Sequence, residues 1–283
     1  MWTNFHTHSA YCDGKGELSH FVQRAIELNM KGIGFSSHAP IPFDCKWCMS
    51  KESFRGYLEE IATLRKVNPD IEIYTGLESD YIPTVISPEQ FKRQLDYVIG
   101  SIHFVDQLPD GSNWEIDGLH TNFLTGLAAI FNNNIRNAIC RYYELTREMI
   151  NSSTPDIVGH IDKIKIQNID KKFFSEEEPW YRHEIAKTID VIQEAGAIVE
   201  VNTRGIYQRK SKTTYPSPWI LEILCERNIP VLLSSDAHHL NDLINQFNET
   251  ARMLEEIGFK TLTSLHEGNW KHFKFNANGI IFS

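Results

Sequence analysis

The sequence predicts an α/β fold, a distorted barrel of parallel strands formed by residues 1–283 as a single domain. Seven short apolar segments bounded by turn residues alternate with seven amphipathic segments whose apolar residues recur every three or four positions. Such repeated alternation implies parallel strands joined by crossover helices. The chain has 283 residues, of which 41% are hydrophobic, so it can bury one large core. An open doubly wound sheet is the alternative that periodicity alone does not exclude.

The elements follow in order along the chain. Strands are expected at 2–8, 32–38, 71–80, 97–103, 157–162, 197–202 and 231–238, because these stretches are rich in apolar and β-branched residues. Helices are expected at 18–29, 52–67, 88–95, 122–150, 180–195, 218–227 and 241–257. The run Asn132-Asn133-Asn134 indicates a break in the fourth helical region, and Gly258 a stop after the last one.

Composition excludes several classes of function. The formal net charge of −9 argues against general electrostatic binding to nucleic acid or to an anionic membrane. No apolar run is long enough to span a bilayer, and the first residues, MWTNFHTH, lack the basic and apolar regions of a signal peptide. The cysteines are odd in number and scattered, which favours a reducing compartment, so we expect a cytoplasmic protein. They are Cys12, Cys45, Cys48, Cys140 and Cys225.

Nearly every expected strand ends in a side chain that can bind a metal. In α/β barrels the carboxyl ends of the strands surround the active site, so these side chains would converge. A single histidine is more often a core or surface residue, but burying this many imidazoles and carboxylates together is costly unless they coordinate cations. The side chains are His6, His8, His38, Glu78, His103, His160, Asp236 and His238. So many nitrogen and oxygen donors exceed the needs of one zinc ion and suit several zinc, manganese or ferrous ions.

Four motifs resemble those of the polymerase-and-histidinol-phosphatase (PHP) family of metal-dependent phosphoesterases. They are HTHSAYCDG from residue 6, SSH at 36–38, SIH at 101–103 and SSDAH at 234–238, in that order and spacing. The resemblance covers essentially the whole chain. It implies a distorted (β/α)7 barrel of the TIM type, with three divalent metal ions in its mouth.

The resemblance also implies how three metal sites divide the ligands. The first site would take His6, His8, Glu78 and Asp236; the second Glu78, His103 and His160; the third Asp13, His38 and His238. Some members of the family have histidine where this chain has Asp13, so the third site gains a negative charge here.

Within the family, GLESDY at 76–81 and GHIDKIK at 159–165 look most like members that hydrolyse L-histidinol phosphate in histidine biosynthesis. A hydroxide bridging the metals would attack phosphorus, with Glu78, Asp236 and Asp13 as catalytic residues. Arg204 follows a strand end and has a fork that matches phosphate, so it is the leading phosphate ligand. Lys163 and Lys165 stand where the resemblance leads us to expect arginine, and are the further candidates.

Other functions remain open from the sequence. A phosphoesterase of the same fold could act on another small phosphate or a nucleotide. A metal-dependent amidohydrolase also uses an HxH motif and a late aspartate, but such enzymes often need a bridging lysine where this chain has Glu78. A non-catalytic scaffold is disfavoured, because every ligand position holds a competent residue.

Three further features concern loops of the predicted barrel. Glu17, Glu115 and Asp117 are candidate acceptors for the ammonium and imidazole of histidinol phosphate, by loop position alone. Cys45 and Cys48 form a CxxC in a proline-rich loop, without the second pair that a structural zinc needs, so we interpret this loop as one that shapes the substrate site. The basic run at 209–212 would be a solvated loop or attract an anionic substrate.

Overall fold

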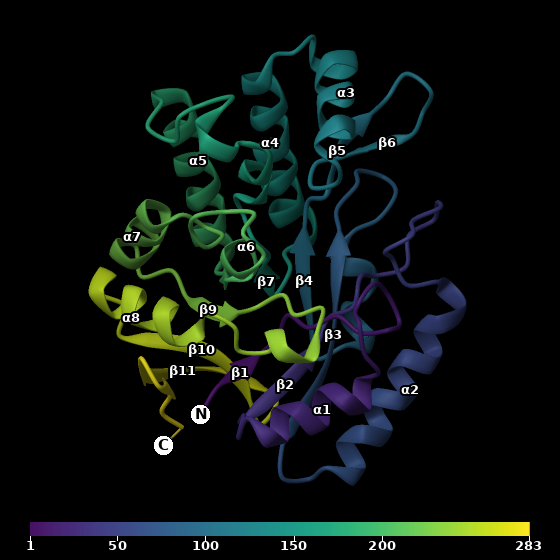
Figure 1. Cartoon of the computed structure of the whole chain (residues 1–283), viewed down its shortest axis with the longest axis vertical. Coiled ribbons are helices and arrows are strands. Elements are labelled where there is room, and N and C mark those ends of the chain that lie inside the picture. Colours follow the sequence, from purple (N-terminus) through teal and green to yellow (C-terminus); the bar gives the residue numbers. More distant parts are fainter. Residues whose placement is uncertain (283) are drawn as a thin grey trace.

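Seven parallel strands form the centre of the molecule in a computed structural model that describes residues 1–282 (Figure 1). They are β1 (Thr3–Asn4), β2 (Gly32–Phe35), β3 (Glu72–Asp80), β4 (Tyr97–Ser101), β7 (Ile157–Val158), β8 (Ile198–Asn202) and β9 (Val231–Ser234). The strands pair in that order. The first and last segments then meet, because Thr7 and Ala237 form a parallel bridge and the His8 N–H donates to the Ala237 carbonyl at 2.8 Å. The sheet is therefore a distorted seven-stranded barrel, as the sequence predicted.

Helices are arranged around the outside of this barrel (Figure 1). They are α1 (Leu18–Glu27), α2 (Lys51–Val67), α3 (His120–Phe131), α4 (Ile135–Ser153), α5 (Pro179–Ala195), α6 (Arg204–Tyr207), α7 (Pro218–Glu226) and α8 (Phe247–Ile257). Asn132 and Asn133 adopt φ values of 50° and 61° between α3 and α4, so the predicted break is confirmed. Gly258 has a φ of 117° directly after α8, where a left-handed residue ends the helix.

Several predicted boundaries were wrong. The helix expected at 88–95 is two short 3-10 turns, Pro88–Gln90 and Lys92–Gln94. The last helix starts at Phe247 rather than at residue 241, because Gln246 has a left-handed φ of 66° that no α-helix interior accepts. Most strands also end two to four residues earlier than predicted, since the chain beyond them makes only isolated bridges.

Two small antiparallel sheets were not predicted. One is the hairpin of β5 (Phe104–Gln107) and β6 (Asn113–Glu115), and the other joins β10 (Thr261–His266), β11 (Asn269–Asn276) and β12 (Gly279–Ile280). Trp270 of β11 packs edge-on against Phe5 and Tyr97, at ring-centroid distances of 5.5 and 6.2 Å. Leu265 of β10 belongs to the same apolar cluster inside the barrel. The C-terminal hairpin therefore closes the amino end of the barrel and leaves the carboxyl end for the site.

Figure 1 shows both termini on the same side of the molecule, beside β10 and β11. The Met1 ammonium donates to the carbonyl of Ile280 at 3.3 Å, so the two ends of the chain touch. Among residues 1–282, no helix has the length and apolar content needed to cross a membrane.

Candidate metal centre

The predicted ligands meet at the carboxyl end of the barrel. Glu78 lies within β3, and Asp13 lies in the loop after β1. The other ligands follow the ends of strands. Strand β1 is followed by His6 and His8, and β9 by Asp236 and His238. Asp236 adopts a φ of 52°, an unfavourable value for a non-glycine residue, which turns the chain sharply at the site.

Glu78 occupies the middle of the cluster and is only 2% exposed. Its Oε2 lies 3.2 Å from His6 Nε2, 3.4 Å from His8 Nε2 and 3.1 Å from His38 Nδ1. Its Oε1 lies 2.9 Å from His160 Nε2 and 3.5 Å from His103 Nε2. One carboxylate thus faces five imidazoles, which is the arrangement of a carboxylate able to bridge metal ions.

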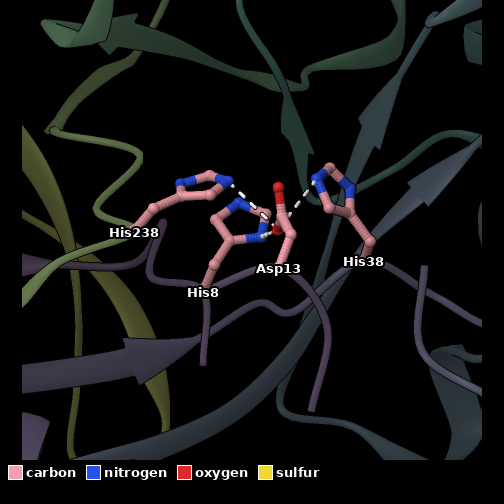
Figure 2. Close-up of side chains that lie close together, drawn as sticks. All are labelled: His8, Asp13, His38 and His238. Atoms are coloured by element: carbon pink, nitrogen blue, oxygen red, sulfur yellow. Dashed lines mark ion pairs between the residues drawn. The ribbon is translucent and has the colours of Figure 1, made fainter. Parts of the chain in front are cut away.

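Two aspartates complete the cluster. Asp236 Oδ1 lies 3.3 Å from His8 Nε2. Figure 2 shows the Asp13 carboxylate directed toward three imidazoles, with His238 Nε2 at 3.2 Å, His8 Nδ1 at 3.8 Å and His38 Nε2 at 3.9 Å from its Oδ1. The structure therefore brings together all nine side chains that the sequence analysis proposed.

Unpaired buried atoms show that the cluster fits metal ions. Within residues 1–282, five buried ligand atoms lack a hydrogen-bond partner: His6 Nε2, His8 Nε2, Asp13 Oδ1, His38 Nδ1 and His103 Nε2. Buried polar atoms are normally satisfied, so this concentration requires an explanation. A divalent ion supplies one, because nitrogen and carboxylate oxygen are the ligands of zinc, manganese and iron.

The imidazoles of the cluster differ in their protonation states. Burial lowers the pKa of His38 to about 4 and holds the pKa of His8 well below its usual value, so both imidazoles are neutral near pH 7. Burial alone would raise the pKa of Glu78, but His6, His38 and His103 hold it well below its usual range. Burial alone would lower the pKa of His6 and His103, but the nearby carboxylates, Glu200 beside His6 and Asp80 beside His103, raise the first well above its usual value and the second to about 9. These two imidazoles would therefore release a proton when a cation binds.

The geometric groups overlap the three predicted sites without matching them. Ligand atoms lie within 4.8 Å of one another in three sets: His8, Asp13, His38 and His238; His6, His8 and Asp236; and His38, Glu78 and His103. His8 and His38 each belong to two sets. The division of ligands among three ions stays a prediction.

Two carboxylates that were not predicted from the sequence accept hydrogen bonds from ligand imidazoles. The His6 Nδ1–H donates to Glu200 Oε1 at 2.5 Å, and the His103 Nδ1–H donates to Asp80 Oδ1 at 3.1 Å. Each bond fixes the ring so that Nε2 faces the centre, as carboxylate partners do for metal-bound histidines. Glu200 is fully buried, and a charged residue flanked by valines within a barrel strand was the available signal.

Comparison with known proteins agrees with this geometry. The family model of the PHP domain matches residues 4–204. This chain belongs to the PHP domain family. It is 27% identical over 272 residues to a probable histidinol-phosphatase of Deinococcus radiodurans, covering 92% of this chain and 95% of that protein. It is 26% identical to the histidinol-phosphatase of Bacillus subtilis, and the alignment covers 84% of this chain and 94% of that protein.

A solved structure shares the fold of this PHP domain. It is histidinol phosphate phosphatase from Lactococcus lactis subsp. lactis Il1403, complexed with zinc, L-histidinol and phosphate. The TM-score is 0.69 at 18% sequence identity, and the alignment covers 99% of both chains. This similarity supports the prediction of a distorted (β/α)7 barrel.

A cavity of the PHP domain opens over the metal centre. Three cationic side chains, Lys163, Arg204 and Lys210, line it together with Asp13, His38, His103, Asp236 and His238. Arg204 Nη1–H donates to the Asp236 carbonyl at 2.7 Å, and Lys163 Nζ lies 3.1 Å from Asp117 Oδ2. Two of the three predicted phosphate ligands, Arg204 and Lys163, therefore line the cavity.

Lys165 does not reach this cavity. Its ammonium donates to Asp162 Oδ2 at 2.7 Å, to the Thr214 carbonyl at 2.8 Å and to Ser217 Oγ at 2.5 Å. Those buried partners occupy its donors, so the expectation that Lys165 binds phosphate is not supported here. Lys210, from the basic run at 209–212, takes a place in the lining instead.

The remaining candidates divide between the cavity and the surface. Glu115 and Asp117 line the cavity, whereas Glu17 is exposed at the start of α1. Cys45 and Cys48 form a disulfide, which the expectation of a reducing compartment did not include. Between them Trp47 lines the cavity, with its ring centroid 4.5 Å from that of His38.

Proposed function

We propose that this protein hydrolyses L-histidinol phosphate to L-histidinol and phosphate in histidine biosynthesis. One observation carries the proposal: a cluster of nine potential ligands, most of them buried, adjoins a cavity that is also lined by three cationic side chains and by the Glu115 carboxylate. The names of the relatives support the same substrate. Such a biosynthetic role would place the protein in the cytoplasm.

The cluster would hold three divalent ions, which zinc, manganese or iron could supply. Nine residues would provide the ligands: His6, His8, Asp13, His38, Glu78, His103, His160, Asp236 and His238. Bound ions would lower the pKa of water and neutralise charge on the phosphoryl group. The zinc in the structurally similar Lactococcus enzyme supports this choice of metals.

The cationic side chains would bind the phosphate end of the substrate. The Arg204 side chain is 20% exposed and is held by the Asp236 carbonyl, so its guanidinium keeps a fixed place beside the ligands. Lys163 Nζ lies 4.0 Å from Asp236 Oδ2, so this ammonium also lies beside the predicted ligands. A fixed guanidinium and a buried ammonium both favour a dianionic phosphate.

Glu115 would bind the ammonium of histidinol phosphate. It lines the cavity, and within residues 1–282 it forms no ion pair, whereas the neighbouring Asp117 is paired with Lys163. Burial, together with the charge of Asp117, raises the pKa of Glu115, and an ammonium bound beside it would stabilise the carboxylate form. The ring of Trp47 offers an apolar face in the same cavity for the imidazole.

Phosphate release from L-histidinol phosphate tests the function. Protein reconstituted with zinc, manganese or iron would be assayed against this ester and a panel of other phosphomonoesters. We expect kcat/KM to favour histidinol phosphate strongly. Weak turnover of all the esters at similar rates would be consistent with a metallophosphoesterase but would contradict histidinol phosphate as its substrate. If the metal-loaded protein released phosphate from no ester, the proposal that it is a phosphatase would be wrong.

A further inference from the structure

Tyr215 has a buried hydroxyl group for which the described part of the chain provides no hydrogen-bond partner. The residue is 2% exposed, and within residues 1–282 its Oη has no hydrogen-bond partner. A buried hydroxyl without a partner is unfavourable, and most such groups in proteins are satisfied. Tyr215 also lines the cavity above the metal centre, so a bound molecule could supply the missing partner.

The backbone holds Tyr215 in a fixed place. The Asn202 N–H donates to the Tyr215 carbonyl at 2.7 Å, and the Tyr215 N–H donates to the Asn202 carbonyl at 3.0 Å. Asn202 is the last residue of β8, two positions before Arg204. The tyrosine is thereby attached to the end of the strand that precedes Arg204, the proposed phosphate ligand.

The side chain is equally constrained. Gly205 lies against the hydroxyl-bearing end of the ring, where a Cβ would approach Tyr215 Cζ to 3.0 Å and Cε2 to 2.8 Å. The Lys165 ammonium lies 5.1 Å from the ring centroid. Since Lys165 is itself anchored by buried partners, the ring is packed between a glycine backbone and a fixed cation. A donor placed in advance in this way needs little reorganisation when ligand binds.

The surroundings of the hydroxyl indicate what it binds. Lys163, Arg204 and Lys210 line the same cavity, and Gly205 beside the ring also belongs to the lining. Three cations attract a phosphate group, and a neutral hydroxyl adds a directional hydrogen-bond donor without further charge. Burial raises the pKa of Tyr215, so the hydroxyl keeps its proton and remains a donor near neutral pH.

We propose that Tyr215 is a substrate-binding residue whose hydroxyl donates a hydrogen bond to a non-bridging oxygen of the phosphoryl group. This assignment rests on the proposed phosphatase function. It adds a residue that lies eleven positions after Arg204, in the loop before α7, and that no sequence motif indicated.

Tyr215→Phe tests the assignment, because it removes only the hydroxyl. Calorimetry would measure the Kd of inorganic phosphate for the metal-loaded wild type and variant. Kinetics would compare L-histidinol phosphate with p-nitrophenyl phosphate. We expect the phosphate Kd to rise about 10- to 100-fold, as for loss of one hydrogen bond to a charged group. We expect kcat/KM to fall by a similar factor for both esters, since they share only the phosphoryl group.

Tyr143→Phe is the matched control. Its hydroxyl is also buried, but it lies 3.0 Å from Tyr181 Oη and not in the cavity. We expect the control to leave the phosphate Kd and kcat/KM unchanged. Metal content and melting temperature of each variant would establish that the site is intact.

Other results would overturn the assignment. An unchanged phosphate Kd would do so, as would a loss confined to histidinol phosphate, which would place the hydroxyl against the organic part of that ester. Failure of the wild type to bind phosphate at all would also reject it. Failure of the proposed substrate is distinguishable, because the phosphate Kd and turnover of p-nitrophenyl phosphate do not depend on histidinol.

Discussion

At the scale of single residues, Glu200 gives a prediction about metal affinity. Its carboxylate accepts hydrogen bonds from His6 Nδ1 and from the backbone N–H of His160, the latter at 2.8 Å, so one side chain orients two ligand segments. Glu200→Gln replaces one acceptor oxygen by a donor and removes the charge. We expect metal affinity to fall about 10- to 100-fold, as for other partners of metal-bound histidines. Competition with a chromophoric chelator would measure it.

Glu194→Gln is the control for this change, because Glu194 is exposed on α5. It should bind metal like the wild type. Equal metal affinities in the Glu200 variant and the wild type would show that the buried carboxylate does not support His6. A loss of activity alone would not suffice, so metal content is the deciding measurement.

Glu115 gives a prediction about substrate choice. If its carboxylate binds the ammonium of histidinol phosphate, Glu115→Gln should raise KM for that ester about 10-fold or more, as for a lost hydrogen bond between charged groups. p-Nitrophenyl phosphate lacks the ammonium, so its kinetics should not change. Steady-state assays with both esters make the comparison. A similar loss with the two esters would place Glu115 at the phosphate end instead.

The sequence was enough to predict the placement of residues that lie at or near the ends of parallel strands. His6, Glu78 and Asp236 converge because the strands are parallel, and their carboxyl ends must meet. Lys165 could not be placed in this way. It lies in a 3-10 helix, Lys163–Gln167, where three residues complete a turn and side chains two apart point in different directions. The place of Tyr215 could not be predicted either, because only a tertiary contact, its bridge with Asn202, brings this loop to β8.

At the scale of elements, the C-terminal hairpin shows what a periodicity search overlooks. β10 and β11 pair from Thr261 with Lys274 to His266 with Asn269, leaving the two-residue turn Glu267-Gly268. Both turn residues have positive φ, 52° and 73°, which is the turn that matches the twist of paired strands. The sequence contained this signal, a glycine turn between two segments of alternating polarity. It was missed because the seven strand–helix units already accounted for a barrel.

Trp270 tests what this hairpin contributes. Its ring packs on Phe5 and Tyr97 within the barrel, so Trp270→Ala should lower the free energy of unfolding by about 2–4 kcal/mol, near the range for large aromatic truncations. Denaturant unfolding would measure it. Lys274→Ala on the exposed face of β11 is the control and should be close to neutral. Equal stabilities of the two variants would mean that the hairpin does not support the barrel.

At the scale of the whole molecule, the candidate metal centre joins segments that are far apart in the sequence. Its ligands follow β1, β2, β4, β7 and β9 or lie within β3, so an ion bound there links most of the barrel. The fold around the cluster was predictable, because ordinary parallel-strand topology determines it. The allocation of ligands to individual ions was not, because it depends on distances of a few tenths of an ångström that no sequence pattern fixes.

Removal of the ions should therefore destabilise the entire fold. A metal ion that binds only the folded chain, and is present at 100 times its Kd, adds about 2.7 kcal/mol to the free energy of unfolding. For a chain of this size about 1 kcal/mol corresponds to 2–4 °C, so a chelator should lower Tm by about 5–10 °C, and added metal should restore it. Asp236→Asn, which removes a charged ligand, should abolish most activity and show a smaller chelator effect. A Tm that stays constant while the bound metal is lost would mean that the barrel already satisfies its buried carboxylates and imidazoles without ions.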